Sequence, residues 1–216
     1  MDVDLELEDS DNEETITAQS VLAKLEEAWM NEKFSPEILP HRTEIVDCML
    51  EQIHQMEENL NKLKKSDFRV VIHRMELDRI RYIITSYLRS RLEKIELYTS
   101  HILEMESKRP VEERYLSPAE YKFAQEHQSH LENHFETVVL RHMPYNIRTL
   151  DKATMSVAPN LFSQVFLRAN KTVNGVIVET GVEGAEEEVE LDGNSQHIIQ
   201  YKAIAELVKS GSVQLI

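Results

Sequence analysis

The sequence predicts an α+β protein in sequence order, with an all-α helical A domain followed by a small β-rich B domain. Apolar residues recur at helical spacing up to Pro144, and short β-branched runs separated by Asn, Gly and acidic turns follow it. A hydrophobic fraction of 41% with 5 Gly in 216 residues favours a folded, mostly helical chain. We expect an acidic disordered tail at 1–16, the A domain at 17–143, a linker at 144–160 and the B domain at 161–216.

The first two helices are predicted from their apolar stripes and their terminators. The first begins near Thr17 and stops around Pro36, because proline cannot continue a helix. The second extends from about Thr43 to Lys65. Its inward-facing positions are Ile45, Val46, Met49, Ile53, Met56, Leu60 and Leu63.

The third and fourth helices complete the A domain. Ser66 can cap a third helix that reaches Ser107, a length of roughly 63 Å if unbroken. A compact chain of this size is only about 45 Å across, so the helix either breaks near Thr99 or protrudes toward partners. Ser117-Pro118-Ala119-Glu120 combines a capping serine, a proline and a glutamate that reaches back, which predicts the start of a helix ending near His142.

The B domain is predicted from the runs VFLRA, GVIVE and EEVEL, which have strand-like composition. The last 24 residues, GNSQHIIQYKAIAELVKSGSVQLI, predict a strand or turn, a short helix and a final strand. We expect that final strand, with Val213, Leu215 and Ile216, to be inserted in the sheet. Ile198, Ile204 and Leu207 would pack over it.

The charge balance restricts the classes of partner. The net charge is −15, and residues 1–14 contain eight acidic side chains and no basic one. Nucleic acid is therefore a poor candidate for the dominant ligand, because phosphate contacts require clustered Lys and Arg. The single cysteine, Cys48, cannot form an internal disulfide, and no apolar run approaches the ~20 residues of a membrane span. These features predict a soluble intracellular protein that does not enter membranes.

Motifs of catalysis or cofactor binding are absent from the sequence. There is no Gly-rich phosphate loop, Gly-x-Ser-x-Gly, His-Glu-x-x-His or Cys-x-x-Cys. His127, His130 and His134 share one helix edge, as metal ligands can, but a solvated face explains them better. We therefore expect no catalytic residue, no metal and no cofactor, and a metal-dependent enzyme built on these histidines is the weaker alternative.

Residues 74–96, RMELDRIRYIITSYLRSRLEKIE, contain five arginines on one helix. At about 100° per residue, an apolar face roughly 140° wide contains Ile80, Ile84, Tyr87, Leu88, Leu92 and Ile95. Arg91 lies in the middle of that face and Arg81 lies between Leu88 and Leu92, whereas Arg79 and Arg89 point away. Arginines on an apolar face need carboxylate or carbonyl partners. This pattern fits either the core of one chain or packing between subunits, and it fits DNA contact least.

The same residues resemble a known family. MELDRIRYIITSYLRSRLEKIE is similar to the signature helix of GINS subunits of the Sld-five type, and the similarity extends through EEAWMNEKFSPEIL, MEENL, LRHMP, VFLR and the C-terminal SQHIIQYKAIAELVKSGSVQLI. The resemblance implies a heterotetramer of four related subunits with A and B domains. It also implies a nuclear, non-catalytic scaffold in DNA replication that joins the Mcm ring and a Cdc-type partner in the replicative helicase.

From the wheel and the resemblance together we expect a set of subunit-interface residues. These are Trp29, Glu76, Arg81, Tyr82, Ile84, Tyr87, Leu88, Arg91, Leu92, Ile198, Tyr201, Val213, Leu215 and Ile216. A helical DNA-binding module acting through Arg79, Arg89, Lys64 and Lys65 is the alternative.

The acidic tail contains two further candidates. Ser10 is followed by Asp11, Asn12, Glu13 and Glu14, a context that suits an acidophilic kinase. Asp2, Val3, Asp4, Leu5 and Leu7 alternate acidic with apolar side chains, as a docking peptide does. The resemblance suggests a hub that tethers polymerase alpha as the partner, and a purely solubilising tail is the alternative.

Overall fold

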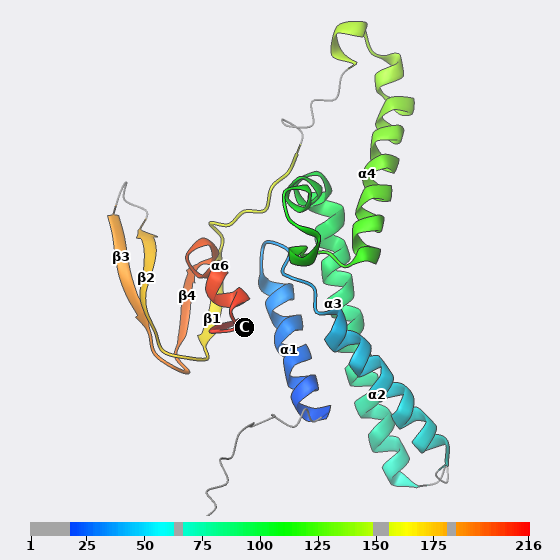
Figure 1. Cartoon of the computed structure of the whole chain (residues 1–216), viewed down its shortest axis with the longest axis vertical. Helices are drawn as coiled ribbons and strands as arrows, with labels where there is room; N and C mark the ends of the chain where they lie inside the picture. Colours follow the sequence, from blue (N-terminus) through cyan, green and yellow to red (C-terminus); the bar gives the residue numbers. More distant parts are fainter. Residues whose placement is uncertain (1–17, 63–66, 149–155, 181–184) are drawn as a thin grey trace, which may run out of the picture.

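A computed structural model describes residues 18–62, 67–148, 156–180 and 185–216. The helical part contains α1 (Ala18–Phe34), α2 (Thr43–Lys62), α3 (Phe68–Ser107) and α4 (Pro118–Val138). α3 is the central element, with α1 and α2 beside its first half and α4 beside its second half (Figure 1). This order of helices before strands confirms the predicted fold class. Within the described ranges, no helix is both long and apolar enough to cross a membrane.

α3 begins and bends close to the predicted positions. Asp67 is its N-cap, and its side chain accepts a hydrogen bond from the Arg69 amide at 3.0 Å. The predicted cap, Ser66, lies outside the described residues, as do Leu63 and Lys65. The backbone leaves helical geometry at Tyr98 (φ −115°, ψ 26°), and Thr99 Oγ1 donates to the Ile95 carbonyl at 2.6 Å. The predicted break near Thr99 is thus confirmed to within one residue.

α4 begins at the predicted capping box. The Glu120 amide donates to Ser117 Oγ, and the Ser117 amide donates to the Glu120 carboxylate. The α-helix ends at Val138, four residues before the predicted end. Short 3₁₀ turns at Val111–Glu113, Leu140–His142 and Tyr145–Ile147 complete this region.

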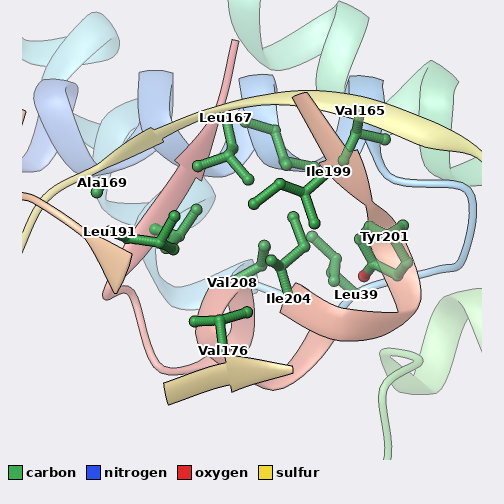
Figure 2. Packing of buried hydrophobic residues seen from close by; sticks show 12 residues of the cluster. Leu39, Val165, Leu167, Ala169, Val176, Leu191, Ile199, Tyr201, Ile204 and Val208 are labelled. Atoms are coloured by element: carbon green, nitrogen blue, oxygen red, sulfur yellow. The ribbon is translucent and has the colours of Figure 1, made fainter. Parts of the chain in front are cut away.

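The B domain consists of a three-stranded antiparallel sheet, a hairpin and a helix. The sheet has the order β4-β1-β5, from β1 (Gln164–Ala169), β4 (Gln196–Gln200) and β5 (Val213–Leu215). The hairpin is β2 (Val173–Thr180) with β3 (Ala185–Leu191), and the helix is α6 (Tyr201–Lys209). Figure 2 shows Val165, Leu167 and Ile199 projecting from the sheet toward Ile204 and Val208 of α6.

One prediction about the last strand is confirmed and one needs correction. β5 belongs to the B-domain sheet as predicted, where it is an edge strand paired only with β1 among the described strands. Ile198 is 57% exposed and does not pack over it, because the alternation of β4 places Ile199 on the core face instead. Ile204 is fully buried and Leu207 packs against the same core, as expected. Val213 and Leu215 have no exposed surface, so the terminal strand belongs to the core.

Candidate protein-interaction surface

A buried ionic cluster lies at the centre of α3. Arg91 has no exposed surface, and its guanidinium binds the Glu120 carboxylate through two hydrogen bonds, Nε–Oε1 at 2.7 Å and Nη2–Oε2 at 3.0 Å. Nη1 donates to Glu32 Oε2 at 3.0 Å and to the Leu39 carbonyl at 2.7 Å, and Nη2 donates to the Tyr115 carbonyl at 2.9 Å. The prediction that an arginine within the apolar face needs carboxylate partners is confirmed. The planar guanidinium suits so many acceptors in one place.

The proton affinities inside the cluster follow from these contacts. Burial opposes the charged form of Arg91, but its hydrogen bonds to Glu120 and the charge of Glu32 outweigh burial and raise its pKa. Burial alone would raise the pKa of Glu120, yet hydrogen bonds and charge from Arg91 hold it below the ordinary value. Both groups therefore stay charged near neutral pH.

The ionic cluster also holds the segment between α1 and α2. Lys94 Nζ donates to Glu32 Oε1 at 2.7 Å, to Ser35 Oγ at 2.8 Å and to the Glu37 carbonyl at 2.9 Å. Together with the bond from Arg91 to the Leu39 carbonyl, these contacts fix residues 35–39 against α3.

Residues 35–39 form part of the surface that contacts the B domain. The Leu39 side chain is part of the B-domain core (Figure 2). Glu37 Oε1 accepts a hydrogen bond from the Tyr201 hydroxyl at 3.0 Å and forms an ion pair with Lys209 at 3.3 Å. On α1, the buried Asn31 accepts a hydrogen bond from the Leu215 amide at 2.8 Å. The buried cluster of the helical part thus supports the surface on which the β-rich part rests.

Six of the predicted interface residues are buried within the chain itself. They are Ile84, Tyr87, Arg91, Tyr201, Val213 and Leu215. Their surroundings are intrachain: Tyr87, for example, accepts a hydrogen bond from the Arg42 amide through its hydroxyl oxygen. A side chain without exposed surface cannot contact another protein directly. We therefore correct the expectation of direct contact for these six residues, which instead shape the surfaces around them.

The remaining predicted interface residues are accessible. Tyr82 is 64% exposed and meets the Trp29 ring edge-on at 6.2 Å between centroids. Leu88, Leu92 and Ile198 are also exposed, and Glu76 and Ile216 are half-buried. Arg81 pairs with Glu57 and Asp78 at the surface instead of being buried, because it lies at the margin of the apolar face.

An exposed apolar stripe on α3 was predicted from the sequence at Tyr82 alone. Phe68, Val71, Ile72, Met75 and Tyr82 are 73%, 51%, 50%, 68% and 64% exposed, and we call them the outer stripe. At about 100° per residue they occupy an arc roughly 160° from the buried face of the same helix. Their spacing of i, i+3, i+4 and i+7 is the spacing at which one helix packs on another. The apolar spacing at residues 68–75 was the signal that could have revealed it.

The basic residues of the DNA-binding alternative do not form a free strip. Arg79 is engaged by Glu26 at 2.6 Å and by Glu76 at 3.3 Å. Arg89 is exposed, whereas Lys64 and Lys65 lie outside the described residues. Carboxylates placed against Arg79 repel the phosphates that this residue was expected to bind, so the arrangement does not support the alternative.

The other candidates have separate surroundings. His127 shares a hydrogen bond with Thr99 Oγ1 at 3.1 Å and stacks on Phe123, while His130 and His134 are exposed. In the described part of the chain, no three His, Cys, Asp or Glu side chains are grouped as metal ligands. Cys48 is half-buried beside the core of α1, α2 and α3. Ser10 and the alternating segment Asp2, Val3, Asp4, Leu5 and Leu7 lie outside the described residues.

Comparison with known proteins identifies relatives over the full chain. Residues 48–139 match the family model described as "GINS complex protein helical bundle domain", and residues 159–216 match "DNA replication complex GINS protein SLD5 C-terminus". The chain is 48% identical to the DNA replication complex GINS protein SLD5 of Rattus norvegicus, covering 99% of this chain and 98% of the relative. The same protein from Homo sapiens is 45% identical, with 100% and 99% coverage. That from Arabidopsis thaliana is 33% identical, with 94% coverage of both.

Proposed function

The chain belongs to the Sld5 family of GINS complex subunits in DNA replication, and on that premise we propose that it is a non-catalytic scaffold. In this proposal it assembles with three sister GINS subunits into a heterotetramer in the nucleus. The tetramer joins the Mcm ring and a Cdc-type partner as a component of the replicative helicase. Initiation and fork progression would both depend on it.

The outer stripe of α3 is the observation that carries the proposal. Five large apolar side chains on the solvent side of one helix are unusual for a chain that acts alone. The opposite face of α3 is already filled by α1, α2 and the ionic cluster, so the helix has a rigid support behind the stripe. Its spacing suits a partner helix laid along α3. We therefore assign the sister-subunit contact to the outer stripe, with Trp29 beside Tyr82 at its edge. The exposed Leu88 and Leu92 lie on another side of α3 and remain a separate part of the proposed interface.

Co-expression with the three candidate sister subunits tests this function, with the mass of the purified complex as the readout. We expect one complex containing a single copy of each chain. A paired substitution, Val71→Ser with Met75→Ser, should remove this chain from the complex, since truncating central apolar anchors costs on the order of 2 kcal/mol each. Val111→Ser is the matched control, because Val111 is 73% exposed in the 3₁₀ turn that follows the C-terminal end of α3, at the other end of that helix from the outer stripe. Equal loss with the control, or a stable tetramer with the paired variant, would overturn the assignment.

The acidic tail is proposed as a separate tether. Asp2, Val3, Asp4, Leu5 and Leu7 would dock a hub that tethers polymerase alpha, and phosphate on Ser10 would add roughly −1.5 to −2 charges beside that peptide. Deletion of residues 1–16 should leave the tetramer intact and abolish binding to the hub. Retention of hub binding after the deletion would reduce the tail to a solubilising segment.

A further inference from the structure

The outer face of the B-domain sheet differs in charge from the rest of the chain. Strand alternation places Phe166 of β1 and Ile198 of β4 on the face opposite the core, and the two are direct cross-strand neighbours. They are 60% and 57% exposed, although each is a large apolar side chain. The α6 side of the sheet is filled, so these two residues form an apolar centre with no cover among the described residues.

In the described part of the chain, the strand positions around this centre carry no carboxylate side chain. The same face presents the side chains of Gln164, Arg168, Gln196, Gln200 and Gln214. The whole chain has 39 Asp and Glu and a net charge of −15, so a sheet face without acid is a local exception. Arg168 binds the neutral amide oxygen of Asn194 at 3.0 Å and therefore keeps its full charge. In the first turn of α6, beyond the end of the β1–β4 ladder, Lys202 Nζ lies 5.0 Å from the centre of the exposed Phe162 ring.

Acidic side chains of the B domain gather instead on the neighbouring hairpin. β3 has the sequence AEEEVEL, with Glu188 and Glu190 exposed. In Figure 1 this hairpin extends past the β4-β1-β5 sheet. A negatively charged ligand would therefore be attracted to the sheet face and repelled by the hairpin, and this asymmetry fixes the direction of approach.

We propose that the outer face around Phe166, Ile198 and Arg168 is a docking surface for an acidic amphipathic segment of a partner protein. Apolar side chains of the segment pack on Phe166 and Ile198. Its carboxylates pair with Arg168 and accept hydrogen bonds from the surrounding glutamine amides. The surface lies on the B domain, away from the outer stripe, so this contact is additional to the assembly proposed above.

A peptide-binding experiment tests the surface in the full-length chain, co-expressed with the sister subunits where they co-purify. The probes are two short fluorescein-labelled peptides, one alternating Leu with Asp or Glu and one alternating Leu with Lys. Fluorescence anisotropy should show saturable binding of the acidic peptide alone. Phe166→Ser combined with Ile198→Ser should weaken it at least about tenfold, and Arg168→Gln about fivefold. Ile177→Ser is the matched control, because Ile177 is 58% exposed on the hairpin strand β2.

Three results would overturn the proposal: equal binding of the lysine peptide, equal loss with Ile177→Ser, or no binding of the acidic peptide. Tighter binding to a chain lacking residues 1–16 would also overturn it, since it would make the chain's own tail the occupant.

A second experiment uses a photo-crosslinkable acidic peptide on the unmodified protein, so it does not depend on a variant that could fail to fold. Crosslinks should map to β1 and β4, and crosslinks elsewhere contradict the proposal. The mass of the co-expressed complex is read separately, so failure of assembly is distinguished from failure of docking.

Discussion

The amide of Leu215 donates a 2.8 Å hydrogen bond to Oδ1 of Asn31, although 184 positions separate the two residues. β5 is the edge strand of its sheet, and the neighbouring Ile216 amide donates to the Phe166 carbonyl of β1. The Leu215 amide therefore faces away from the sheet, where Asn31 satisfies it. One buried amide of α1 thus closes a strand edge that is otherwise open to pairing with other chains.

Asn31→Ala should loosen the B domain more than the helices. The substitution leaves a buried Leu215 amide without an acceptor, which costs about 1–3 kcal/mol. Limited proteolysis with mass spectrometry should show faster cleavage within residues 161–216, while α3 remains resistant. Asn133→Ala on the exposed side of α4 is the control and should change neither. If residues 161–216 of the Asn31 variant resist proteolysis as well as in the unmodified protein, the hydrogen bond from Leu215 to Asn31 contributes nothing to holding the B domain on the helices.

Arg91→Met should destabilise the helical part severely. It leaves Glu32 and Glu120 without their shared partner, and breaking a buried ion pair from one side costs about 3–5 kcal/mol. Arg91→Lys should not rescue the loss, because an ammonium cannot reproduce a bidentate bond to Glu120 together with three further acceptors. Urea denaturation of the assembled protein measures the effect. Arg89→Met serves as the control on the exposed side of the same helix, and an equal loss there would refute the assignment.

The loss of folding stability at acidic pH should depend on Glu120. Arg91 lowers the pKa of the Glu120 carboxyl in the folded state below its value in the unfolded chain. The ionised carboxylate therefore stabilises the fold at pH values above its ordinary pKa. This contribution is lost as the pH falls through the lowered value. Glu120→Gln keeps a side chain that can complete the capping box. The variant should be less stable at neutral pH and decline less steeply below about pH 4.5. The urea unfolding midpoint measured at a series of pH values tests this prediction, with the exposed Glu136→Gln as the control. If the midpoint of Glu120→Gln falls with decreasing pH as steeply as that of the unmodified protein, the prediction is contradicted.

Removal of residues 212–216 should unfold the B domain and spare the A domain. Val213 and Leu215 are fully buried, and burial of each such side chain contributes about 1.5–3 kcal/mol. The truncation also removes the amide that binds Asn31. Proteolysis should then digest residues 161–211. We also propose that the B domain helps to anchor the subunit, so the truncation should weaken the tetramer. Persistent resistance of 161–211 would show that the terminal strand is dispensable.

Features governed by local chemistry were predictable from the sequence. The proline after Phe34, the capping box at Ser117 and Glu120, and the switch to β-branched runs each act within a few residues, and the elements appear where they predict. Arg91 was also found within its apolar face, because helical geometry alone places it there. Its partners Glu32 and Glu120 were not identified, since they come from separate helices.

Features governed by tertiary packing were harder to predict from the sequence. Both faces of α3 contain apolar residues, so their positions on a helical wheel do not show which face is covered by the chain's own residues. The buried face containing Tyr87 was therefore assigned to contacts with other subunits. Ile198 and Ile199 are adjacent, and a one-residue difference in strand register exchanges the core side chain for the exposed one. Leu39 lies between two helices, and no local pattern indicates that it joins the core of a domain more than 120 residues away.

Oxidation of Met75 tests the central claim most directly, namely that the outer stripe is the surface covered by a sister subunit. Met75 is 68% exposed on the stripe, whereas Met49 is 3% exposed in the core of the same helical part. Hydrogen peroxide should oxidise Met75 readily in the full-length chain alone and much more slowly in the assembled complex, and Met49 should remain slow in both. Mass spectrometry of the peptides gives both rates in one experiment. Equal oxidation of Met75 in the free and assembled chain would show that the stripe faces solvent and that the subunits meet elsewhere.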